Sequence, residues 1–117
     1  MLRFWRATVN SRNGLAFAIR SEQAIREELV ALALALPLAW LVSVTLMRWI
    51  ELVAAVALVL IVELLNTAIE KLADRLTLDR DPQIGRVKDM GSAAVGVTLI
   101  TAGLFWIFAI VERLWAL

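Results

Sequence analysis

Four polar residues at helical spacing carry the clearest chemistry in this sequence. They are Glu63, Asn66, Glu70 and Asp74, separated by three, four and four positions. Because residues three and four apart share one face of an α-helix, the spacing predicts a single polar stripe. The residues before it, 52–62, are apolar, so the stripe forms the polar half of a membrane helix. Ionisable groups inside a span cost about 2.5–3.5 kcal/mol each and usually face a bundle interior.

Two interpretations of the stripe follow. The first is a functional acidic site; the second is a set of hydrogen bonds between helices that holds an oligomer together. The sequence contains no Cys and no His, which excludes thiolate nucleophiles, imidazole bases and the commonest zinc ligands. Any acid–base chemistry therefore falls to carboxylates or Lys.

A second acidic group comprises Glu22, Glu27 and Glu28, with Arg26 among them. It lies where an interfacial segment turns into the first apolar stretch. Its alternative interpretation is a solvated helix start, because acids near a helix N-terminus are favoured by the dipole. Taken alone, the group is better explained as a solvated helix start than as part of a functional site.

The third group is residues 85–92, in which two bases precede a run of small residues. Cations and amides at a helix start suit phosphate, although a basic anchor followed by a close-packing seam explains the same pattern. Together the three groups supply what phosphoryl transfer needs: acids for a divalent cation and bases for phosphates. Neither GxxxxGK[ST] nor GxGxxG occurs, which excludes P-loop and protein-kinase-like nucleotide sites.

The elements that must position these groups are helices in a membrane. The chain has 117 residues, 62% of them hydrophobic, and a mean hydropathy of +0.80. These values predict one all-α membrane domain, 1–117. An amphipathic interfacial region, broken near Asn13 and Gly14, should precede three spans. The expected bounds are 1–21 for the interfacial region, 26–47, 50–72 and 89–112 for the transmembrane helices, and 73–88 for a cytoplasmic loop.

The basic residues predict the orientation, because short loops rich in Lys and Arg stay cytoplasmic. Five bases precede the first span and five lie between the second and third, whereas only Arg48 and Arg113 fall on the opposite side. We therefore expect a cytoplasmic N-terminus and loop, and a periplasmic C-terminus. The net charge of +1 argues against nucleic acid as a partner.

Two motifs make the sequence recognisable. Glu63-Leu-Leu-Asn66-Thr-Ala-Ile-Glu70 with Asp74-Arg75, and Gly85-Arg86-Val-Lys88-Asp89-Met-Gly91-Ser92, resemble the signature of the prokaryotic diacylglycerol kinase family. Residues 22–28 resemble its pre-membrane motif, and Arg3, Ser11, Gly14 and Leu15 fall at matching distances before it. The resemblance implies an ATP-dependent lipid kinase of the bacterial inner membrane. It also implies a homotrimer with active sites shared between subunits.

The resemblance also implies roles for individual residues. Glu63 matches the catalytic base and Asn66 the residue that orients it. Between Val62 and Leu64, Glu63 should be desolvated and able to take a proton from a lipid hydroxyl. By the same resemblance, Mg²⁺ is bound by Glu22 and Glu70. The nucleotide is bound by Lys88 and Asp89, together with Glu22 and Glu70. The substrate is bound by Arg3, Ser11 and Ser92, together with Glu63.

The expected reaction is transfer of the ATP γ-phosphate to the primary hydroxyl of 1,2-diacylglycerol, giving phosphatidic acid. Undecaprenol kinase, a small ion-coupled transporter and a structural membrane subunit are the alternatives. Arg12-Asn13 and Asp81-Pro82 depart from the family pattern near the expected adenine region. No adenine contact is therefore assigned from the sequence.

Overall fold

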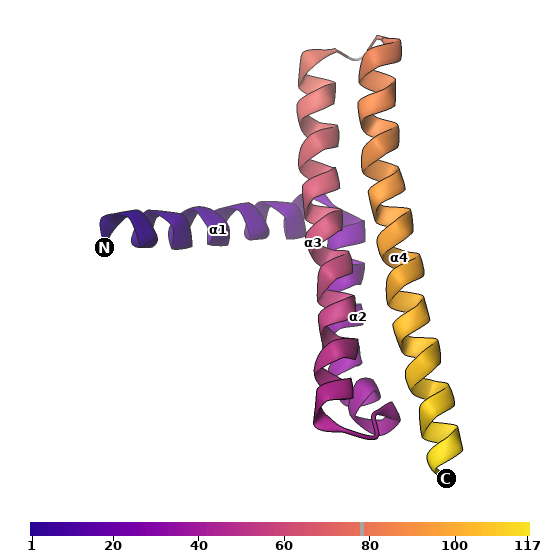
Figure 1. Cartoon of the computed structure of the whole chain (residues 1–117). Helices are drawn as coiled ribbons and strands as arrows, with labels where there is room; N and C mark the ends of the chain where they lie inside the picture. The colour runs from indigo at the N-terminus through magenta and orange to yellow at the C-terminus, as the bar shows by residue number, and fades with distance from the viewer. Residues whose placement is uncertain (78) are drawn as a thin grey trace.

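The computed structural model describes residues 1–77 and 79–117 as four helices (Figure 1). The predicted all-α class is confirmed. In chain order they are α1 (Leu2–Ser21), α2 (Gln23–Val42), α3 (Leu46–Leu76) and α4 (Pro82–Ala116).

Helix α1 lies across the bundle formed by the other three helices, and its N-terminal end extends away from them (Figure 1). It continues through Asn13 and Gly14, where the sequence predicted a break. No glycine in the described residues has a positive φ. A glycine inside a helix costs only about 1 kcal/mol, so the helix formers around it prevail.

A single extended residue, Glu22, turns the chain from α1 into α2. Arg26 fixes this turn, because its Nη1 donates to the carbonyl oxygens of Ile19 at 2.7 Å and Arg20 at 3.2 Å. These carbonyls lie in the last turn of α1 and have no partner within the helix. The acidic residues that follow are thereby held at a defined angle to α1.

Helices α2, α3 and α4 pack side by side, with α3 contacting both neighbours. Ala39, Leu52 and Ala109 form a fully buried core toward one end of this bundle. Two of these are alanines, which let the helix backbones approach closely. At the same end, Arg48 on α3 binds Glu112 on α4 through two hydrogen bonds, of 2.9 and 3.1 Å.

The helix bounds differ from the predicted ones at capping residues. The predicted first span, 26–47, ends early at Val42, because Thr45 caps α3 by accepting a hydrogen bond from the Arg48 amide at 3.1 Å. The predicted loop, 73–88, is mostly helical. Helix α3 runs to Leu76, and Asp81 caps α4. Residue 78 lies outside the described residues.

Helices α3 and α4 are long and apolar enough to cross a membrane. Helix α2, which the sequence predicted as the first of three spans, does not qualify, because Arg26, Glu27 and Glu28 charge its first turns. Large apolar side chains are nevertheless exposed on all four helices. Exposure on this scale is typical of a surface that meets lipid or other subunits.

Candidate functional site

The polar stripe occupies the second half of α3, as its spacing predicted. Asn66 is buried, Glu63 and Glu70 are half-buried, and Asp74 is exposed. At about 1.5 Å per residue, α3 spans roughly 46 Å, more than the 30 Å of hydrocarbon in a bilayer. Part of α3 therefore projects from the apolar layer.

Glu63 lies near Glu28, a member of the second acidic group to which the sequence had assigned no role in the site. Glu28 lies on α2, one turn beyond the buried Ile25. Both carboxylates are half-buried. The i, i+3 spacing from the apolar Ile25 placed Glu28 on the inward face of α2, but not opposite any particular residue of α3.

Asn66 contacts Glu70, one turn along the stripe. Its Nδ2 donates to Glu70 Oε1 at 3.3 Å, while its Oδ1 is buried without a partner in the described part of the chain. The resemblance implied that Asn66 orients Glu63. In this structure the hydrogen bond of Asn66 goes to Glu70 instead.

Lys71 joins the α1–α2 turn to α3. Its Nζ lies 2.8 Å from Glu22 Oε1 and 5.2 Å from the centre of the Phe17 ring. Because Lys71 directly follows Glu70, this ion pair brings Glu22 to the turn of α3 that carries Glu70. Two of the predicted metal ligands thus lie in one region, linked by a Lys to which the sequence had assigned no role in the site.

The described residues contain no cluster of three or more acidic side chains able to hold a metal. Magnesium does not require one, since it usually binds through one or two carboxylates together with nucleotide phosphates and water. Glu22 and Glu70 supply oxygen donors of the kind that suits this ion. They fit a metal that arrives with a nucleotide better than a resident metal.

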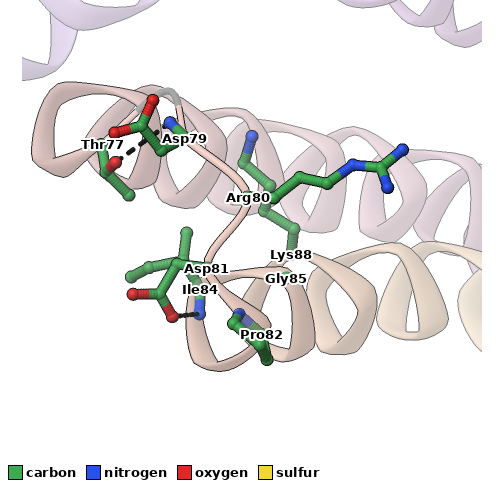
Figure 2. Close-up of a pocket in the computed structure, with 8 residues that line it drawn as sticks. All are labelled: Thr77, Asp79, Arg80, Asp81, Pro82, Ile84, Gly85 and Lys88. Atoms are coloured by element: carbon green, nitrogen blue, oxygen red, sulfur yellow. Dashed lines mark hydrogen bonds between the residues drawn. The ribbon is translucent and has the colours of Figure 1, made fainter.

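A pocket of about 410 Å³ is lined by residues that follow α3 and by the first turns of α4 (Figure 2). Two side chains hold the backbone around this pocket by accepting hydrogen bonds from its amides. Asp81 accepts from the amides of Gln83 at 2.9 Å and Ile84 at 3.2 Å, and Thr77 accepts from the Asp79 amide at 3.0 Å. The lining residues are Thr77, Asp79, Arg80, Asp81, Pro82, Ile84, Gly85 and Lys88.

Lys88 connects this pocket to the polar stripe. Its Nζ pairs with the Asp74 carboxylate across the α3–α4 contact. The neighbouring Asp89 and Ser92 are exposed. Of the predicted residues on α4, the structure therefore brings Lys88 to α3 and leaves Asp89 and Ser92 on the surface of the single chain.

An apolar groove of about 560 Å³ runs between α1 and α3. Ser11 lines it, although its Oγ donates to the Ala7 carbonyl at 2.8 Å. Arg3, two turns earlier, is exposed and does not line the groove. The lining residues are Ser11, Gly14, Leu15, Phe17, Ala18, Leu64, Thr67, Ala68 and Lys71.

Comparison with known proteins shows which family this chain resembles. A family model described as prokaryotic diacylglycerol kinase matches residues 9–110. The chain is 41% identical over 104 residues to a diacylglycerol kinase of Escherichia coli (strain K12), covering 89% of this chain and 85% of that protein.

Two further diacylglycerol kinases are similar over nearly the same length. One from Pseudomonas aeruginosa (strain PAO1) is 39% identical over 104 residues, covering 89% of this chain and 85% of the relative. One from Haemophilus influenzae (strain Rd) is 36% identical over 100 residues, covering 86% and 85%. The chain belongs to the prokaryotic diacylglycerol kinase family.

Proposed function

We propose that this protein is a membrane lipid kinase that transfers the γ-phosphate of ATP to the primary hydroxyl of 1,2-diacylglycerol, giving phosphatidic acid. The observation that carries the proposal is the position of Glu63. It is half-buried on α3, and the next residue, Leu64, lines the apolar groove against α1. A carboxylate is thereby available where a lipid hydroxyl can reach it from the bilayer.

The groove between α1 and α3 suits the acyl chains of such a lipid. Its lining is apolar except for Ser11, Thr67 and Lys71. Diacylglycerol enters laterally, with its hydroxyl at the polar end of the groove. Arg3, Ser11 and Ser92 contribute to substrate binding, Arg3 and Ser92 from surfaces that are exposed in the single chain.

Glu63 acts as the general base. The hydroxyl oxygen of the lipid attacks the γ-phosphorus of ATP, the bond from that phosphorus to the bridging oxygen breaks, and ADP leaves. The hydroxyl proton passes to Glu63 and then to solvent.

The nucleotide binds on the cytoplasmic side of this base. Glu22 and Glu70 would hold Mg²⁺, and the bound ion would neutralise charge on the phosphates. Lys88 and Asp89 contact the nucleotide. The Lys88 ammonium lies between the polar stripe and the pocket at the helix ends, which fits a phosphate donor that spans both.

The protein resides in the bacterial inner membrane as a homotrimer, with its N-terminus in the cytoplasm and its C-terminus in the periplasm. The distribution of basic residues supports the orientation. The extensive exposed apolar surface and the half-buried acids support an oligomer, because a neighbouring chain would complete their burial. The active sites are shared between subunits.

The acceptor is tested with labelled ATP in mixed micelles that contain either diacylglycerol or undecaprenol. We expect labelled phosphatidic acid and little labelled undecaprenyl phosphate. Faster labelling of undecaprenol would reassign the acceptor but keep the kinase. Labelling of neither lipid would favour transport or a structural role.

A further inference from the structure

Gly91, on α4, lies directly against Asn66 of the polar stripe on α3. A Cβ added to Gly91 would lie 2.1 Å from Asn66 Oδ1 and 3.2 Å from Asn66 Cγ. Real Cβ atoms do not approach another atom so closely, so no other residue type fits unless Asn66 moves. The same construction at Gly96 and Gly103, on the same helix, meets nothing within 4 Å.

Asn66 has little freedom to move away. It is 9% exposed, and its Nδ2 donates to Glu70 Oε1 at 3.3 Å. Its Oδ1, on the Gly91 side, is buried and has no hydrogen-bond partner among the described residues. The amide is therefore held between the bare backbone of α4 and the Glu70 carboxylate. Rotating it away from α4 would break the bond to Glu70.

We propose that Gly91 is a positioning residue for the MgATP site. It seats the Asn66 amide against Glu70 and so fixes the orientation of that carboxylate before the nucleotide arrives. The proposal rests on the proposed function, because it takes Glu70 as a ligand of the nucleotide-bound metal. Gly91 itself touches neither nucleotide nor lipid. Its effect passes through Asn66, as outer hydrogen bonds orient metal ligands in other proteins.

The first test is Gly91→Ala, with Gly103→Ala as the matched control. We expect Gly91→Ala to raise the KM for MgATP about tenfold while kcat falls less than about threefold, since ligand orientation is lost but the base is kept. The Kd for the magnesium complex of a non-hydrolysable ATP analogue, measured by calorimetry, should rise by the same factor. Gly103→Ala should change neither quantity. Wild-type constants in Gly91→Ala would overturn the proposal.

The second test repeats Gly91→Ala in an Asn66→Ala background, where the added methyl group has space and folding is not at risk. If Gly91 acts through Asn66, the single Asn66→Ala variant and the double variant should have the same Kd for the analogue. A further loss in the double variant would overturn the proposal.

Failure of this proposal is distinct from failure of the proposed function. A wild-type protein that phosphorylates no lipid would defeat the function itself. A wild-type kinase whose nucleotide binding is insensitive to Gly91→Ala would defeat only the positioning role.

Discussion

At the scale of single residues, the site consists of four pairs of neighbouring side chains, each of which includes a residue of α3. The pairs are Glu28 with Glu63, Asn66 with Glu70, Glu22 with Lys71, and Asp74 with Lys88. Three of them lie between different helices or between a helix and a turn. The polar stripe of α3 is therefore the surface on which groups from the rest of the chain converge.

Glu70→Gln tests the nucleotide side of the site. It removes one negative charge but keeps an oxygen that can accept from Asn66, so the local hydrogen bond survives. We expect the KM for MgATP to rise about tenfold or more, with the KM for diacylglycerol unchanged. Glu27→Gln is the matched control, because Glu27 is exposed and its side chain, among the described residues, accepts a hydrogen bond only from Gln23. An unchanged KM for MgATP in Glu70→Gln would remove Glu70 from the proposed metal site.

The sequence predicted the stripe but only part of its surroundings. Helical periodicity establishes that Glu63 and Glu70 share a face, because that depends on α3 alone. The approach of Glu28 to Glu63 depends on how α2 crosses α3, and the contact of Lys71 with Glu22 depends on the turn at Glu22. Gly91 was recognised as a small residue in a packing seam. Its contact with Asn66 requires the relative position of two helices.

At the scale of elements, α1 is held to the bundle by few contacts. Ala18 is its only buried residue in the described structure, and Lys71 provides its clearest polar and aromatic attachment, through Glu22 and Phe17. An ion pair this exposed contributes roughly 0.2–1 kcal/mol. Such a contribution matters for a helix with so little packing.

Lys71→Met should therefore loosen α1. Because the chain has no Cys, Thr8→Cys offers a single site for a nitroxide label on an exposed face of α1. We expect the label to become more mobile in Lys71→Met, whereas Lys71→Arg, which keeps the charge, should retain the wild-type spectrum. Identical spectra in all three proteins would show that the Lys71 contacts do not hold α1.

Arg48 joins α3 to α4 at the end opposite the site. It binds Glu112 through two hydrogen bonds, pairs with Glu51 at 2.5 Å and lies 4.8 Å from the centre of the Phe108 ring. A planar, bidentate contact of this kind fixes the relative position of two helices better than a single bond does. The lengthwise position of α4 on α3 in turn sets the contact between Gly91 and Asn66.

Arg48→Gln and Glu112→Gln should each lower the Tm in detergent, and the double variant should be no less stable than Arg48→Gln alone. Arg113→Gln is the control, because Arg113 is exposed and makes no ion pair in the described residues. Thermal unfolding followed by circular dichroism gives the comparison. Fully additive losses in Tm would mean that Arg48 and Glu112 act independently.

The sequence contained the signals for the true helix starts. Thr45 and Asp81 are favoured capping residues, and Pro82 is favoured in the first turn of a helix. Hydropathy alone does not detect these capping signals, because capping depends on single residues whereas hydropathy is an average over many. The predicted bounds followed the edges of apolarity instead of the caps.

At the scale of the whole molecule, some residues of the predicted site do not reach the polar stripe within a single chain. Asp89 and Ser92 are exposed on α4, and Arg3 is exposed near the free end of α1. A trimer with shared sites would use these surfaces, with Asp89 of one subunit completing the nucleotide site around Glu70 of the next. The apolar composition predicted a membrane protein, but composition does not specify which surfaces meet lipid and which meet another subunit.

Mixing two variants that are impaired in MgATP binding, assayed at MgATP well below the KM of either variant, tests whether sites are shared. Glu70→Gln and Asp89→Asn subunits, unfolded and reassembled together at equal amounts, should recover roughly a quarter of wild-type activity. That is the random-mixing fraction of sites with both groups intact in a closed ring of subunits. Each variant reassembled alone provides the baseline. No recovery above that baseline would place Glu70 and Asp89 of an active site in the same chain, or would remove one of them from the site.

The most direct test of the central claim is the rate at which labelled phosphatidic acid forms from labelled ATP and diacylglycerol, in wild-type protein and in Glu63→Gln. We predict a measurable wild-type rate and a fall of about 10²–10⁴-fold in the variant, with binding of the non-hydrolysable ATP analogue retained. A Glu63→Gln variant that phosphorylates diacylglycerol at the wild-type rate would contradict the assignment of Glu63 as the base on which this account depends.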